Sequence, residues 1–157
     1  MKGVCRFLFS FFLSSLAALT IAGEDDVSLK GETTAEYKYV EFNEFGRPEE
    51  VLLIKEEKPR ALKDGEIRVK VLASPINPSN LYQITGNYGS PPEFPAMPGS
   101  EGVGRVIEIS ESVRHIKTGQ LVLLVGGGTW REQIVAPASQ FLPLPELENL
   151  DDKLIEQ

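Results

Sequence analysis

The stretch GEIRVKVLASPIN, residues 65–77, decides the fold class, because its apolar and charged side chains alternate with the period of a β-strand. Three β-branched residues share one face of this stretch and two basic residues share the other: Ile67, Val69 and Val71 against Arg68 and Lys70. This alternation is typical of a strand with one apolar side. We therefore predict a strand whose Ile67 face packs into a core.

Further short stretches have the same character along the chain. They are YKYVEF (37–42), EVLLIKEE (50–57), EGVGRVIEIS (101–110), GQLVLLVG (119–126), TWREQIVAP (129–137) and FLPLP (141–145). The turn-forming EFGRP (44–48) and HIKTGQ (115–120) lie among them. Short strands joined mostly by turns predict an all-β barrel or sandwich.

Two stretches alone have a helical pattern. In NPSNLYQITG (77–86), Asn77 or Ser79 is a candidate N-cap, and Gly86 is suited to end the helix. The second stretch is ELENLDDKLIEQ, residues 146–157. We therefore expect mainly β structure with short helices.

Composition limits the class of protein and its partners. The 157 residues, 41% of them hydrophobic, suit one globular domain of ordinary size. The formal charge of −7 and an isoelectric point near 4.8 repel phosphate backbones and anionic lipid. We expect no nucleic-acid partner.

The first 22 residues have the order of a signal peptide. Basic residues precede an apolar run from Phe7 to Ala22, which is shorter than the ~20 residues of a spanning helix. Thr20 and Ala22 place small residues before a cut at Gly23. We predict a secreted or periplasmic protein, off the membrane after cleavage. The alternatives are an uncleaved membrane anchor and a mitochondrial presequence.

Cleavage there would remove Cys5, the only cysteine, and with it any disulfide or thiolate metal site. Residues 23–36 are polar and predict a flexible leader. We place the folded domain at residues 37–150.

Two glycine clusters could suggest a nucleotide site, but neither has the spacing for one. Gly99, Gly102 and Gly104 are followed by a strand pattern instead of a helix, and no Lys-Ser/Thr pair follows Gly126–Gly128. A bend or a close backbone approach is the better interpretation of both. His115 lies in a polar turn without an acidic pair at ligand spacing, so we interpret it as a solvated loop residue.

At residues 69–109 and 116–135, the order INPSN, QITGNYG, GSEGVG and GTW resembles the N-terminal GroES-like domain of the zinc-free medium-chain dehydrogenases/reductases. Within that superfamily the chain is most similar to mitochondrial-type trans-2-enoyl-CoA/ACP reductases, relatives of quinone oxidoreductases. The resemblance implies a GroES-like barrel from about Tyr37 onward. The zinc branch has a metal-binding histidine where Ser100 stands, and it needs cysteines that residues 23–157 lack. We therefore expect no metal.

The resemblance implies a role for the tyrosine of GNYG, because Tyr88 matches the proton donor of these reductases. A phenol stays protonated at neutral pH, so it can give a proton to Cα of an enoyl thioester after hydride transfer from NADPH. The other interpretation is a tyrosine that fills a turn beside Pro91.

Three further residues match positions near the nicotinamide and the substrate. Two of them are Asn77 and Asn80, for which helix capping is the alternative role. The third is Trp130, which is either a wall of an acyl pocket or a core residue. Glu101 is expected to support its loop.

Such reductases pair the barrel with a doubly wound Rossmann domain that holds NADPH, and the active site lies between the two. From the resemblance we expect the Rossmann domain to be absent from this chain and residues 151–157 to be the start of the linker to it. We expect a truncated, oxidoreductase-like domain of fatty acid metabolism that is inactive alone, so enzyme status stays open. The alternative is an active enoyl-thioester or quinone reductase whose Rossmann domain is supplied by another chain or by readthrough. An apolar face left uncovered would imply such a partner chain or a homodimer.

Overall fold

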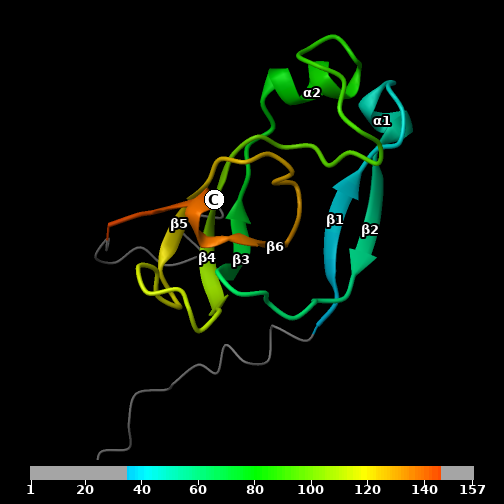
Figure 1. The fold of residues 1–157 in the computed structure, drawn as a ribbon. Coiled ribbons are helices and arrows are strands. Elements are labelled where there is room, and N and C mark those ends of the chain that lie inside the picture. The colour runs from blue at the N-terminus through cyan, green and yellow to red at the C-terminus, as the bar shows by residue number, and fades with distance from the viewer. Residues whose placement is uncertain (1–34, 146–157) are drawn as a thin grey trace, which may run out of the picture.

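The computed structural model describes residues 35–145, which form a curled antiparallel sheet with short helices at one end (Figure 1). In chain order the elements are β1 (Tyr37–Glu41), α1 (Pro48–Val51), β2 (Leu53–Glu57), β3 (Glu66–Ala73), α2 (Pro78–Ile84), β4 (Gly102–Ile109), β5 (Leu121–Leu124), β6 (Gln133–Pro137), the 3-10 turn η2 (Ala138–Gln140) and β7 (Phe141–Pro143). The predicted mainly β class, a GroES-like barrel, is confirmed.

The main sheet has five strands in the order β6-β3-β4-β5-β7, all antiparallel to their neighbours. The strand that decided the fold class, β3, lies between β4 and β6. Strands β1 and β2 form a separate hairpin. Residues 130–132 attach the hairpin to the main sheet, because the Val40 N–H donates to Trp130 O (2.9 Å) and the Val71 N–H donates to Glu132 O (2.8 Å).

The core lies where the Ile67 face of β3 was predicted to pack. Its buried members come from β3, β4, β5, β7 and the turns between them: Ile67, Val69, Val106, Val113, Ile116, Val122, Leu124, Ala138 and Phe141. A second, smaller cluster of Phe42, Ile84 and Ala96 joins the hairpin to α2. Burial of these apolar side chains is the main favourable term holding the strands together.

On the basic side of β3, Arg68 is buried and Lys70 is half-buried, which the alternating pattern did not indicate. Arg68 is only 2% exposed, and its Nε donates to Glu108 Oε2 of β4 at 2.8 Å. Its guanidinium also donates to the carbonyl of Arg60. A buried charge is tolerated when it is paired and hydrogen-bonded in this way. The period-2 pattern therefore predicted the core face of β3 correctly but not the burial of Arg68 on its second face.

The helices agree in part with the sequence. Helix α2 is capped by Asn77, one of the two predicted caps, and Gly86 follows it with a φ of +76°, as an ending glycine should. Helix α1 was not predicted, because residues 44–48 indicated a turn and a strand from residue 50. Pro48 at its first position and Glu49 and Glu50 in its first turn favour that short helix.

Several predictions fall on residues outside the described range. The signal peptide (1–22), most of the leader (23–36) and the helical tail (146–157) remain predictions, and so does the linker at 151–157. No helix within residues 35–145 is long and apolar enough to cross a membrane.

Candidate functional site

The candidate site lies where three loops meet, at the ends of β3 and β5 and the start of β4. Ser74 follows β3, Glu101 precedes β4, and Thr129 follows β5. The Ser74 hydroxyl donates to Glu101 O at 2.9 Å, and the Thr129 hydroxyl reaches the same carbonyl at 3.0 Å. The two hydroxyl oxygens are 2.8 Å apart. Because Thr129 is buried, this small network fixes the three loops relative to one another.

Glycines allow these loops to approach closely. Gly99 has a φ of +93°, and a Cβ there would lie only 2.9 Å from the backbone nitrogen of Trp130. A Cβ on Gly102 would lie 2.6 Å from the carbonyl oxygen of Ala73. The Gly128 N–H donates to Gly99 O at 2.8 Å. The predicted close backbone approach is confirmed for Gly99 and Gly102, whereas a Cβ on Gly126 would meet nothing within 4 Å.

Asn77 and Asn80 lie together at the start of α2. The Asn77 N–H donates to Asn80 Oδ1 at 3.1 Å, and Asn77 Nδ2 donates to Glu101 Oε1 at 2.8 Å. Asn80 is 2% exposed. Both asparagines therefore cap α2 or hold the adjoining loop. Glu101 is hydrogen-bonded to the N-cap of α2, which agrees with its expected role of supporting its loop. Their proximity to nicotinamide or substrate stays a prediction.

Trp130 lies on the same set of loops. Its Nε1 donates to Pro75 O at 3.2 Å, and its ring packs against the Phe42, Ile84 and Ala96 cluster. The sequence placed Trp130 on a strand, but β6 begins only at Gln133. The side chain is half-buried, so part of the indole is accessible beside the loops. Its role as a wall of an acyl pocket stays a prediction.

Tyr88 projects from the loop after α2. It is 59% exposed, and it lies between Gly86 and Gly89, which both have positive φ. Within residues 35–145 no hydrogen bond engages its hydroxyl or joins it to Asn77 or Trp130. The structure thus unites the two asparagines with Glu101 and brings Trp130 onto the adjoining loop, while Tyr88 extends from the neighbouring turn into solvent.

Exposed apolar side chains surround this end of the molecule. Phe45, whose ring contacts Phe94, is one of them. The others come from the segment that carries α2 and the proline-rich loop: Ile76, Leu81, Tyr82, Tyr88, Phe94 and Met97. Figure 1 shows that α2 and this segment cap one end of the curled sheet.

Sequence reasoning missed the hydroxyls of Ser74 and Thr129. Only their places in the sequence could have indicated these two residues: Ser74 directly precedes Pro75, and Thr129 directly follows the glycine triplet. His115 is exposed in its turn, as expected. Across the described residues, no three His, Cys, Asp or Glu side chains gather as metal ligands.

The fold and the glycine-fixed loops define a GroES-like domain. Residues 63–146 match the family model of the alcohol dehydrogenase GroES-like domain, which is more than half of the chain, and the protein belongs to this family. Within the medium-chain dehydrogenases/reductases it is a relative of the enoyl reductases.

Individual relatives agree with this assignment. The mitochondrial enoyl-[acyl-carrier-protein] reductase of Rattus norvegicus is 35% identical over 128 residues, which are 74% of this chain and 34% of that protein. The human enzyme of the same name is 38% identical over 106 residues, covering 66% of this chain and 28% of its own length.

Solved structures give the same picture. The Etr1p complex with NADP and crotonyl-CoA aligns with a TM-score of 0.66 and 31% identity, over 71% of this chain and 34% of that chain. A putative NADPH:quinone reductase from Bacillus thuringiensis aligns with a TM-score of 0.66 and 37% identity, over 79% and 37% of the two chains. The chain therefore spans about a third of the length of the relatives it matches.

Proposed function

We propose that residues 37–150 form the substrate-side barrel of an NADPH-dependent reductase of trans-2-enoyl thioesters, with Tyr88 as the proton donor. The observation that carries this proposal is the position of Tyr88: an exposed phenol on a glycine-flanked turn that follows α2, the helix whose N-cap Asn77 is hydrogen-bonded to Glu101. The similarity to enoyl reductases supports it. Substrate carried on CoA or on an acyl-carrier protein is consistent with those relatives.

The chemistry needs two groups on opposite sides of a substrate. When bound, NADPH supplies a hydride to Cβ of the enoyl thioester. The Tyr88 hydroxyl then gives its proton to Cα, so that the C=C bond becomes a single bond, and solvent returns a proton to the tyrosinate. Asn77 and Trp130 would border the substrate, Trp130 with its half-exposed indole.

The cofactor itself must be held by residues other than those described. Between residues 35 and 145 the two α-helices have four and seven residues, and neither opens after a glycine-rich strand end as a dinucleotide site requires. A Rossmann domain packed on the exposed apolar segment of residues 76–97 would cover that surface and bring a hydride donor to Tyr88. A Rossmann domain supplied by a partner chain or by readthrough is therefore part of the proposal.

Export by the first 22 residues remains our proposal for localisation, with mitochondria as the alternative, because the enoyl reductases it resembles are named as mitochondrial proteins.

The test is the reduction of crotonyl-CoA by NADPH, followed by NADPH absorbance. The chain is assayed alone and fused to the nucleotide-binding part of the rat reductase. We expect turnover only in the fusion, because positioning beside a hydride donor is what makes the phenol effective.

Tyr88→Phe should lower kcat of the fusion by at least about 100-fold. The matched control is Tyr82→Phe, since Tyr82 is 57% exposed on the neighbouring helix and should tolerate the change. Full activity of the Tyr88→Phe fusion would refute the proton-donor role. A folded but inactive fusion would favour the second candidate, a binding domain without reductase activity.

A further inference from the structure

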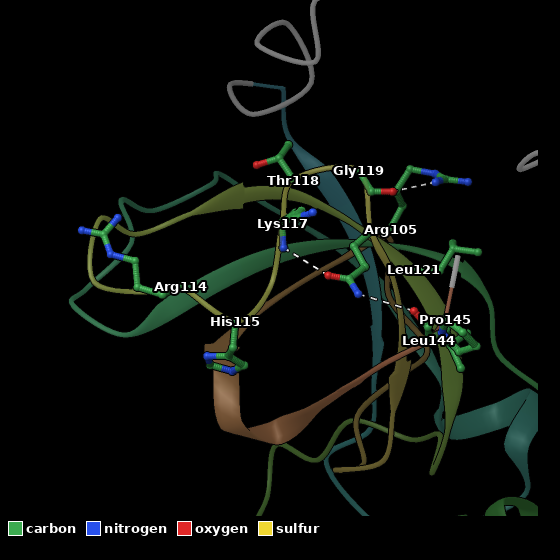
Figure 2. A pocket seen from close by; sticks show the side chains of 10 residues that line it. Arg105, Arg114, His115, Lys117, Thr118, Gly119, Leu121, Leu144 and Pro145 are labelled. Atoms are coloured by element: carbon green, nitrogen blue, oxygen red, sulfur yellow. Dashed lines mark hydrogen bonds between the residues drawn. The ribbon is translucent and has the colours of Figure 1, made fainter. Parts of the chain in front are cut away.

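A hollow of about 460 Å³ lies at the other end of the β4–β5 ladder from the candidate site. In that ladder Gly102 pairs with Leu124 near the site loops, whereas Arg105 pairs with Leu121 beside the hollow. The turn of residues 114–119 and the end of β7 form the rest of its lining (Figure 2). The hollow is therefore separate from the loops that carry the proposed reductase function.

The lining is basic in an otherwise acidic protein. Four of its residues are Arg105, Arg114, His115 and Lys117, and none is Asp or Glu. The whole chain, in contrast, has 23 acidic residues against 16 Lys and Arg. Within residues 35–145 no ion pair joins Arg114, His115 or Lys117 to a carboxylate. Arg114 and Lys117 thus present positive charge that no carboxylate in the described range neutralises.

Hydrogen bonds join the residues that line the hollow to one another. Gln120 accepts from the Lys117 N–H through Oε1 (3.2 Å) and donates to Leu144 O through Nε2 (3.4 Å), so one side chain ties the turn to the end of β7. Arg105 Nη1 donates to Gly119 O at 2.7 Å. A turn that hydrogen bonds already hold in place loses less conformational entropy on binding a ligand than a mobile turn does.

The number of basic residues indicates the charge of the ligand. Figure 2 shows Arg105 and Arg114 extending away from each other, with His115 and Lys117 between them. Several cations attract a ligand with several negative charges more strongly than they attract a single phosphate. Arginine also matches phosphate oxygens with paired N–H donors. We propose that this hollow binds a small molecule that carries a di- or triphosphate group, a site independent of the reductase proposal.

The experiment is isothermal titration calorimetry of the full chain with inorganic tripolyphosphate and with inorganic monophosphate, at neutral pH and low ionic strength. We expect tripolyphosphate to bind with a Kd below about 1 mM and at least about tenfold more tightly than monophosphate. The double variant Arg114→Ser/Lys117→Ser should weaken tripolyphosphate binding by at least about tenfold, since each charge-assisted contact is worth roughly that factor.

The matched control is Lys38→Ser/Lys63→Ser, which changes the net charge equally but leaves the hollow unaltered. It should retain nearly the affinity of the unmodified chain. The proposal is overturned if tripolyphosphate fails to bind at millimolar concentration, if the two double variants weaken binding equally, or if monophosphate binds as tightly as tripolyphosphate. Circular dichroism of all variants confirms that they fold, and both sets of residues are exposed.

Discussion

A single methyl group added at Gly104 should destabilise the sheet that carries the site loops. Gly104 lies within β4, opposite Val71 of β3. A Cβ at this position would lie 2.6 Å from the Lys70 carbonyl oxygen and closer still to a methyl group of Val69. Both neighbours belong to a central strand, and Val69 is fully buried, so neither can move without disturbing the core.

Overpacking of this kind costs about 1–3 kcal/mol, and the reduced freedom of the unfolded chain offsets about 0.4–1 kcal/mol of it. Gly104→Ala should therefore lower the midpoint of urea unfolding by roughly 1 M, from an m-value of about 1–3 kcal/mol/M. Gly126→Ala is the matched control, because a Cβ there meets nothing within 4 Å and the residue has no positive φ. It should unfold at the same or a higher urea concentration. Equal midpoints for the two variants would refute the close approach of β3 and β4.

Two further predictions concern charge and capping. Hydrogen bonds from Arg60 and from the Lys63 N–H lower the pKa of Glu66 from 4.5 to about 2, so its carboxylate stabilises the folded state above pH 4.5 and loses that effect as the pH falls toward 2. Glu66→Gln should thus be less stable than the unmodified protein at neutral pH and equally stable near pH 2; a difference that persists at pH 2 would contradict this. Asn77→Ala should cost about 1 kcal/mol through loss of the α2 cap, and Asn77→Ser should recover part of it; equal losses in urea unfolding would argue against capping.

Most of the fold was predictable because local sequence patterns indicate most of its strands and the ends of α2. The alternation in residues 65–77 placed β3 and its core face, and Asn77 and Gly86 marked both ends of α2. Helix α1 escaped prediction because its four residues are too few to show a helical period. The boundaries of β2 and β6 were placed too early for a related reason: apolar residues adjoin those strands without pairing in them.

The sequence predicted which residues belong to the candidate site but not how they contact one another. Motif order singled out Asn77, Asn80, Tyr88 and Trp130, but no local pattern could indicate that Thr129 would share a carbonyl with Ser74, 55 residues away. That contact depends on the start of β4 lying beside the ends of β3 and β5, which strand pairing decides. The same pairing brings Arg105 to the turn of residues 114–119.

The sequence by itself determined the mainly β class, the face of β3 that enters the core and the glycines that must stay small, because each depends on residues near one another along the chain. Only the tertiary structure decided that Arg68 is buried against Glu108. It also decided that Tyr88 is exposed on the turn after α2 and that four basic residues share one hollow. These features join strands and turns that are distant in the chain. Their physical cause is the pairing and packing of the whole sheet, which a local pattern does not contain.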